Sequence, residues 1–132
     1  MLYNANKKTM ILLFSHTLSA EQIEDAKKWG IYSFLSLPNA LQDTWSNISP
    51  DLEDVTLVLE EIKIYVEKNS KKGDFVLVQG DFGASYHMVN YVKTLGLIPV
   101  YATTKRVVEE YFEEDKSIKK SIFEHRRFRK YV

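Results

Sequence analysis

Three short polar segments each follow an apolar run and carry side chains that can hold or transform a phosphate. Ser15-His16-Thr17 follows TMILL, the segment Gln79 to Ser85 follows FVLV, and Thr103 to Arg106 follows IPVYA. Together they offer hydroxyl groups, one imidazole, the backbone N–H groups of a glycine-rich turn and two cations. This set is typical of a nucleotide-phosphate site, in which an imidazole at a strand end serves as general acid or base. A hydrogen-bonded loop histidine is the alternative for His16.

The segment QGDFGAS places two glycines three residues apart, between an apolar run and a helix-like stretch. If Gly80 and Gly83 adopt positive φ, their N–H groups turn toward an anion at the helix N-terminus. The segment is neither G-x-G-x-x-G nor a P-loop, and a tight strand-to-helix turn needs glycine in any case. Phosphate binding and plain turning are therefore both open. We expect Asp81 to cap the helix rather than to act in catalysis.

Other candidates have structural alternatives. Trp45 is expected in the core, although WSN beside a strand end would also suit an adenine base. His87 is expected to be structural or solvent-facing, and His125, within the basic C-terminal stretch, to help hold an anion. The chain has no cysteine and its histidines lack metal-ligand spacing, so we expect no metal site and no cofactor.

The elements that must position these residues alternate between strand and helix. We expect a long helix to start at Ser49-Pro50-Asp51, because Pro50 suits a first helical position and the apolar residues from Leu52 to Val66 recur at helical spacing. The C-terminal stretch suits a helix or a β-hairpin, and we prefer a hairpin over about 105–131 that turns at Asp115-Lys116-Ser117. The other predicted strands are 9–14, 31–37, 75–79 and 98–104, and the other predicted helices begin after Ser19, near Ala40 and at Gly83. This pattern predicts an α/β fold with a mostly parallel sheet flanked by helices.

Length and composition favour one soluble domain over residues 1–132, with 18 basic and 18 acidic residues. That balance argues against a protein that binds duplex nucleic acid, and the short apolar runs argue against a membrane span. The N-terminal MLYNANKK lacks the apolar core of a signal peptide, so we expect a cytoplasmic location.

Four ordered segments together resemble a known family. The segments are LLFSHTLSAEQIEDAK, LPNALQDTWSNISP, DFVLVQGDFGASYHMVNYVKTLGLIPVYATTKR and SIFEHRRFRKY. In this order they resemble the small CRISPR-associated Csx proteins related to CARF domains, over nearly the whole chain. The resemblance implies a Rossmann-like, CARF-like fold that binds cyclic oligoadenylate, with cyclic tetra-adenylate as the expected ligand.

The resemblance also implies that the chain is a ring nuclease, which cleaves the messenger and switches off type III CRISPR signalling. The expected reaction needs no metal: a ribose 2′-hydroxyl attacks its own 3′-phosphate and leaves a 2′,3′-cyclic phosphate. The expected catalytic residues are His16, Ser15, Gln79 and Lys105. The expected ligand-binding residues are Thr17, Trp45, Asn47, Gly80, Asp81, Phe82, Gly83, Thr103, Thr104, Arg106, His125 and Arg126, and Arg129 also lies in a matching segment.

Because the ring has near-rotational symmetry, we expect a homodimer that holds it across a two-fold axis. One alternative is a non-catalytic protein that binds or sequesters the same ligand. A small nucleotide-binding or stress protein without a messenger role is a further alternative.

Overall fold

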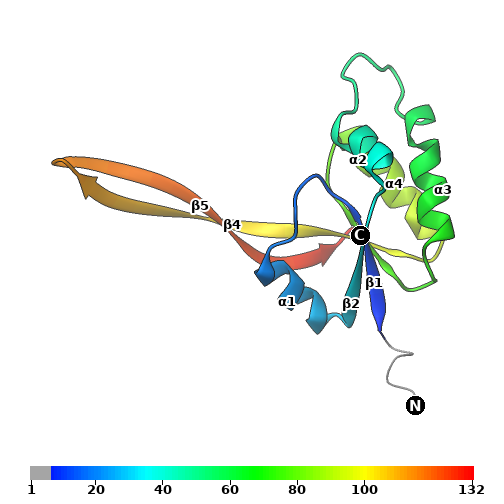
Figure 1. Cartoon of the computed structure of the whole chain (residues 1–132), viewed down its shortest axis with the longest axis horizontal. Helices are drawn as coiled ribbons and strands as arrows, with labels where there is room; N and C mark the ends of the chain where they lie inside the picture. The colour runs from blue at the N-terminus through cyan, green and yellow to red at the C-terminus, as the bar shows by residue number, and fades with distance from the viewer. Residues whose placement is uncertain (1–6) are drawn as a thin grey trace.

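The structure is a computed structural model that describes residues 7–132; residues 1–6, on which part of the signal-peptide prediction rests, lie outside the described residues. Strands and helices alternate as predicted (Figure 1). The elements are β1 (Lys8–Leu13), α1 (Ala20–Lys28), β2 (Ile31–Ser36), α2 (Asn39–Ser46), the 3-10 helix η2 (Leu57–Leu59), α3 (Glu60–Lys68), β3 (Phe75–Val78), α4 (Phe82–Thr94), β4 (Ile98–Glu113) and β5 (Lys116–Lys130).

The strands form one five-stranded sheet in the order β2-β1-β3-β4-β5. The first four are parallel, and β5 is antiparallel to β4. Helices cover both faces of the sheet at its centre, where all four residues of β3 are apolar and buried, whereas only Ile31 is buried in the edge strand β2. The predictions of an α/β fold, a mostly parallel sheet and a C-terminal hairpin are therefore confirmed.

The helices cover the two faces of the sheet unequally (Figure 1). On one face α1 contributes Ala26 to a core cluster that includes Met10 and Phe128. On the other face α2, α3 and α4 contribute a larger cluster that includes Trp45 and Met88. The connection from β1 to β2 thus crosses one face, and the connections that lead to β3 and β4 cross the other.

Local signals explain where several helices begin and end. Ser19 and Gln22 form the predicted capping box, in which each side chain accepts the other's backbone N–H, at 3.1 and 2.8 Å. Gly30, directly after this helix, has φ +80° and lets the chain turn into β2.

The predicted long helix from Pro50 is wrong, because the chain forms no helix there until η2. Side chains in this segment bond to nearby backbone instead: Ser49 Oγ accepts from Asp51 N at 3.2 Å and Asp54 Oδ1 accepts from Thr56 N at 2.7 Å. Such bonds compete with helix formation. The hydrogen bonds from Thr56 also lower the pKa of Asp54. The later apolar positions of the same pattern, including Ile62, are buried as predicted.

The C-terminal hairpin is longer than predicted and turns one residue earlier. Strand β4 continues without interruption from the sheet to Glu113, and Lys116 begins β5. The two turn residues, Glu114 and Asp115, have φ 49° and 62°, as a type I′ hairpin turn requires. Thr103 pairs with Arg127 and Thr104 with His125, so Arg126 is the extra residue of a β-bulge.

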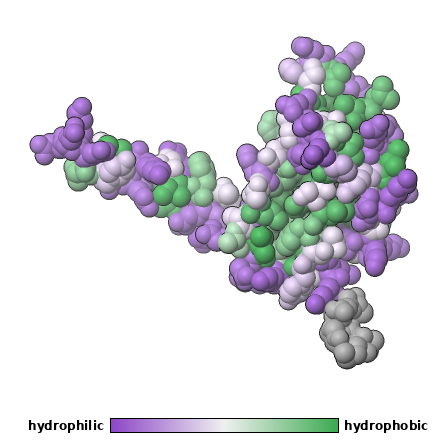
Figure 2. All heavy atoms as spheres, in the orientation of Figure 1, coloured by the Kyte–Doolittle hydropathy of each residue, from purple (hydrophilic) through white to green (hydrophobic). Residues whose placement is uncertain are grey.

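Beyond this bulge the hairpin leaves the rest of the molecule. We call residues 105–124 the arm and the other described residues the body. The arm projects as a two-stranded ribbon with no other element beside it (Figure 1), and the body carries the broad apolar surfaces in Figure 2. Asp25 of α1 fixes the hairpin at the base of the arm, where its Oδ2 accepts from Phe128 N at 3.0 Å and lies 2.9 Å from His125 Nε2.

Candidate functional site

The carboxyl ends of β1 and β3 frame a crevice at the point where the chain's connections change faces. In open α/β sheets this topological switch point is the usual ligand site. Here it holds a hollow of about 230 Å³, the switch-point hollow, which is lined by Phe14, Ser15, His16, Gln79 and Gly80. The sequence-based expectation that these two segments meet is confirmed.

A hydrogen-bond network fixes the serine of this hollow. Ser15 Oγ lies 2.9 Å from Ser46 Oγ, and Gln42 Nε2 donates to Ser46 Oγ at 2.9 Å. Gln42 Nε2 also donates to the carbonyl of Phe14 at 3.1 Å, so one amide ties α2 to the end of β1. The bonds of Gln42 and Ser46 were not predicted: Gln42 was not a candidate, and in the segment WSN the candidates were Trp45 and Asn47. The signal was their spacing of four residues, which places both on one face of α2.

His16 is exposed at the mouth of the hollow, and its ring packs edge-on against Phe14 at 5.4 Å between centroids. Thr17 follows it and is also exposed. Both residues line a second hollow of about 490 Å³, which extends between β1 and β2 toward Asn39 and Gln42. The imidazole is therefore open to solvent and to a ligand on two sides.

Gly80 is required for close packing rather than for positive φ. A Cβ at this position would lie 2.9 Å from the indole ring of Trp45. Trp45 itself is buried, and its Nε1 donates to the carbonyl of Gln79 at 3.1 Å, so the core alternative is correct and base stacking by Trp45 is excluded. The glycines with positive φ are Gly30, Gly73 and Gly96, so of the two alternatives for Gly80 and Gly83 the positive φ that would turn their N–H groups toward an anion does not occur.

The turn continues into α4 as the capping prediction required. Asp81 Oδ2 accepts from Ala84 N at 2.9 Å, which makes Asp81 the N-cap, and Gly83 lies in the first helical turn. Phe82 between them is 94% exposed. Its ring therefore makes little contact with the rest of the described chain.

Gln79 has a structural bond that its position at the strand end did not predict. Its Oε1 accepts from Ala102 N at 2.7 Å and so links the end of β3 to β4. The side-chain amide nitrogen of Gln79 is left to face the hollow.

The segment Thr103 to Arg106 does not end at the strand-end edge as expected, because these residues continue β4. Thr103 Oγ1 donates to the carbonyl of Arg127 at 2.9 Å, and Thr104 pairs with His125. Arg106 donates to Ser121 Oγ at 3.0 and 2.9 Å, within the arm. Lys105 and Arg106 therefore extend past the strand-end edge and do not line the switch-point hollow. Strand β4 continues beyond the edge because it pairs with the antiparallel strand β5, whereas its parallel partner β3 ends at the edge.

The remaining expected ligand contacts also lie elsewhere. His125 bonds to Asp25 of α1, and Arg126 lines a hollow with the acidic face of that helix, including Glu21 and Glu24. Asn47 ends α2 and donates to the carbonyl of Asp43 at 2.9 Å. None of these three residues lines the switch-point hollow.

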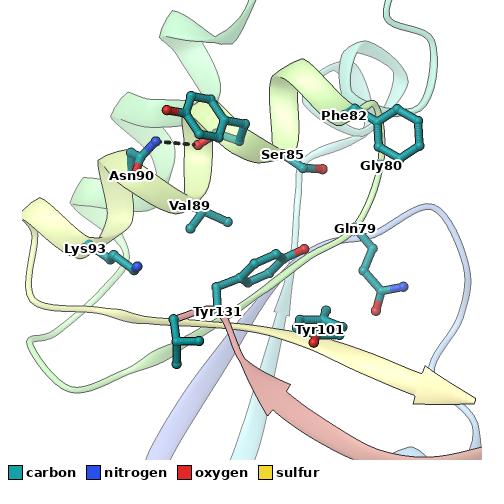
Figure 3. A pocket seen from close by; sticks show the side chains of 11 residues that line it. Gln79, Gly80, Phe82, Ser85, Val89, Asn90, Lys93, Tyr101 and Tyr131 are labelled. Carbon is teal, nitrogen blue, oxygen red and sulfur yellow. Dashed lines mark hydrogen bonds between the residues drawn. The ribbon is translucent and has the colours of Figure 1, made fainter.

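An aromatic hollow of about 550 Å³ adjoins the switch-point hollow and shares Gln79 and Gly80 with it (Figure 3). Tyr101 and Tyr131, with ring centroids 4.8 Å apart, lie between β4 and α4, and Phe82 and Tyr86 of α4 complete the aromatic lining. The sequence analysis did not select either Tyr101 or Tyr131 because they resemble ordinary strand aromatics.

Hydrogen bonds fix both tyrosine rings. Tyr131 Oη donates to the carbonyl of Val78 at 2.6 Å, and Arg129 Nη1 donates to Tyr101 Oη at 3.0 Å. Burial, and then the neighbouring Tyr101, raise the pKa of Tyr131. The tyrosines thus form a rigid surface on which a planar group can stack.

Two polar side chains of α4 line the same hollow. Asn90 Nδ2 donates to the carbonyl of Tyr86 at 3.1 Å, which leaves one amide N–H and Oδ1 to bind a ligand. Lys93 lies one helical turn further along and makes no ion pair with a carboxylate among residues 7–132. Of the residues that line the switch-point and aromatic hollows, Lys93 alone is a cation.

Within the described part of the chain, no group of three His, Asp or Glu side chains is placed to hold a metal ion. None of the helices described is both long and apolar enough to cross a bilayer.

Comparisons with known proteins place the chain in a family. A relative from Methanocaldococcus jannaschii, described as "Uncharacterized protein MJ1673", is 49% identical over 123 residues, which cover 92% of this chain and 95% of the relative. No solved structure matches the chain. Residues 8–129 match a single family over almost the full length of the sheet and its helices. The chain belongs to the family described as the Uncharacterized protein MJ1673 family.

Proposed function

We propose that the protein binds a cyclic oligoadenylate, cyclic tetra-adenylate in the first instance, at its strand-end edge and cleaves it as a ring nuclease. The observation that carries this proposal is the junction of two hollows at Gln79 and Gly80. One hollow presents Ser15 and His16, which suit a phosphodiester, and the other presents aromatic rings, which suit a base. The resemblance to the Csx proteins supports the same ligand.

The strand order also supports a Rossmann-like, CARF-like fold. The order β2-β1-β3-β4 matches the first part of the flavodoxin-type order 2-1-3-4-5, in which ligands bind at the β1/β3 switch point. The antiparallel β5 replaces the last parallel strand of that order.

The aromatic hollow binds the adenine base in this proposal. Tyr101 and Tyr131 provide stacking surface, which contributes about 1–3 kcal/mol per base in single-stranded nucleic-acid sites. Asn90 Oδ1 accepts from the adenine N6 amino group, and its remaining N–H donates to N7, the pairing by which asparagine reads adenine. Guanine presents O6 where Asn90 needs a donor, so the hollow disfavours it.

The switch-point hollow binds the phosphodiester that follows this base. His16 accepts the proton of the ribose 2′-hydroxyl as its oxygen attacks the adjacent phosphorus. The bond from phosphorus to the 5′-oxygen breaks, the leaving oxygen takes up a proton, and the ring opens to a linear product with a 2′,3′-cyclic phosphate. Ser15, held by Ser46 and Gln42, donates to a non-bridging oxygen and aligns the attack.

Charge on the phosphate is balanced by two further groups of the joined hollows. Gln79, which lines both hollows, offers its amide nitrogen, and Lys93 offers an ammonium group from the opposite end of the aromatic hollow (Figure 3). They replace Lys105 and Arg106 in this role, because those residues stand on the arm.

A homodimer follows from the symmetry of the ligand. Each chain has one such edge, so a two-fold pair of chains presents two matching sites to one ring. Cleavage by a chain that stays monomeric with the ring bound would contradict this part of the proposal.

A binding protein without catalysis is the second candidate. Two of the four expected catalytic residues cannot act as expected, because Gln79 Oε1 accepts a hydrogen bond from Ala102 N and Lys105 lies outside the switch-point hollow. A protein with this geometry would hold the ring intact and act by sequestering it.

Radiolabelled cyclic tetra-adenylate incubated with the protein in EDTA tests these alternatives. Linear products support the ring nuclease, and an intact but retained ring supports sequestration. A ring that is neither cleaved nor retained refutes both proposals. His16→Ala should slow cleavage by roughly 10²–10⁴-fold and keep the ring bound. Asn90→Ala should weaken binding by about 5- to 150-fold. Phe123→Ala, on the arm and 67% exposed, is the matched control and should change neither.

A further inference from the structure

The arm leaves two long strand edges open. Strand β4 pairs with β3 only from Ile98 to Val100, and Gln79 takes one further N–H at Ala102. From Thr103 to the turn, β4 has β5 on one side and no described strand on the other. The outer side of β5 has no described strand beside it, and only near Phe128 does another element, α1, take up an outward N–H through Asp25. Unpaired edges of this kind are templates for pairing with another chain.

The two edges differ in charge, and β5 is protected against such pairing. Lysines occur along it at Lys116, Lys119 and Lys120, and arginines follow at Arg126 and Arg127. A second β5 placed beside it would meet the same positive charges. Lysine-rich edges are a common protection against edge-to-edge association.

The β4 edge has the opposite property, because its charge pattern complements itself when reversed. The base of the arm is basic, at Lys105 and Arg106. Two valines, Val107 and Val108, come next, and acidic and aromatic residues continue to the tip, at 109–113. In an antiparallel copy paired about Val108, Arg106 lies opposite Glu110 and Val108 lies opposite its own copy. Lys105 lies opposite Tyr111 and has Glu109 and Glu113 as diagonal neighbours on the same face.

We infer that two copies of this chain associate through the β4 edges of their arms, antiparallel about a two-fold axis at Val108. Arg106 of one copy then faces Glu110 of the other, Lys105 lies diagonally between Glu109 and Glu113, and the two copies of Val108 meet at the centre. The partner at the β4 edge is a second copy of this chain, because a two-fold antiparallel pair uses the same strand edge twice and therefore needs an edge that complements itself. This is the pattern of β4 and not of β5.

The pairing also explains how so long a ribbon is stable. An isolated two-stranded hairpin is marginally stable in water, whereas three or more strands support one another. The arm's side-chain hydrogen bonds join only its own two strands, as between Arg106 and Ser121. Pairing gives the four-stranded order β5-β4-β4-β5, in which both remaining edges are the protected β5 strands.

This axis differs from the one proposed for binding a cyclic ligand. Eight residue steps from Lys105 to Glu113 span about 27 Å. The antiparallel arms thus hold the two bodies at opposite ends of the ribbon. The association therefore forms without ligand, and it stands or falls independently of the proposed ring nuclease activity.

The test is the mass of the ligand-free protein by size exclusion with light scattering. Wild type should have twice the chain mass of 15.4 kDa. The variants K105E/R106E and E110K/E113K should each have the mass of one chain, because like charges then face each other. The combination of all four changes should restore the dimer. Arg127→Glu, which also reverses one charge but lies on β5 opposite the neutral Thr103, is the matched control and should remain dimeric.

Folding of each variant is checked by the fluorescence of Trp29 and Trp45, both in the body. Hydrogen exchange gives a second readout, since outward-facing amides of 104–113 should be protected in wild type and unprotected in the charge-reversed variants. A monomeric wild type, a dimer that survives both charge reversals, or a fourfold variant that stays monomeric would each overturn the inference.

Discussion

The same hairpin has a buried half and an exposed half, and the difference shows what stabilises this fold. Phe128 and Phe123 lie five residues apart on β5, yet Phe128 is 1% exposed and Phe123 is 67% exposed. Both sit in one continuous ladder with β4. What changes at the bulge opposite Thr103 and Thr104 is the presence of a covering helix, because α1 packs on the body half only.

In the body half, backbone, side chain and helix act together. Phe128 packs into the core cluster that holds Ala26, and its N–H donates to the Asp25 carboxylate of the same helix. In the arm half the ladder has only its own cross-strand contacts, such as Val107 opposite Ile122. Burial therefore decides which half carries the free energy of folding, even though the hydrogen-bond pattern is shared.

The largest expected effect compares one phenylalanine from each half. Phe128→Ala should lower the free energy of unfolding by about 3–5 kcal/mol, because a fully buried ring leaves a cavity. Phe112→Ala on the arm, where the ring is 76% exposed, should change it by less than about 0.5 kcal/mol. Urea unfolding followed by tryptophan fluorescence measures both. Equal losses would show that the arm belongs to the same cooperative unit as the body.

A smaller loss of stability is expected from a substitution in the body at the candidate site. Gly80→Ala should destabilise by about 1–3 kcal/mol, because its Cβ would contact the buried Trp45 ring at 2.9 Å. Gly83→Ala is the control: its Cβ would meet its nearest atoms at 3.5 and 3.8 Å, and alanine favours the helix by up to about 1 kcal/mol. Chemical denaturation gives the free energy of unfolding of both variants, and the emission maximum of Trp45 reports whether its surroundings have changed. A neutral Gly80→Ala would contradict the close packing.

The smallest effect is expected when the arm is removed. Thr104 and His125 are direct partners, so an Asn-Gly turn can join them in place of residues 105–124. At protein concentrations low enough to keep the chains apart, the free energy of unfolding should change by less than about 1 kcal/mol, since only loop closure differs. Thermal and urea unfolding provide the measurement. Loss of folding in this variant would mean that the arm supports the body.

Local chemistry made part of the candidate site predictable. Ser15, His16 and Gly80 follow apolar runs short enough to be buried parallel strands, and the ends of such strands meet at one edge. Asp81 was recognisable as an N-cap because its side chain needs only the next helical turn. Gln42 and Ser46 were missed because their bonds to Phe14 and Ser15 depend on how α2 packs across the sheet.

The fold, like the site, was predictable from local sequence only in part. Apolar runs and helix signals indicated most elements, whereas the helix expected from Pro50 failed where Ser49 and Asp54 bond to nearby backbone. The end of β4 was also misplaced. A strand continues as long as it has a partner, and β5 pairs with β4 up to Glu113, far beyond the edge of the parallel sheet.

The sequence by itself determined the alternation of most strands and helices, the caps at Ser19 and Asp81 and the turn chemistry that favoured a C-terminal hairpin, because each depends on residues within a few positions of one another. Only the tertiary structure decided that Trp45 supports Gly80 from the core, that Tyr101 and Tyr131 meet across two strands, and that Lys105 and Arg106 extend beyond the site. These outcomes depend on packing between segments far apart in the chain, where burial and strand pairing outweigh local preference.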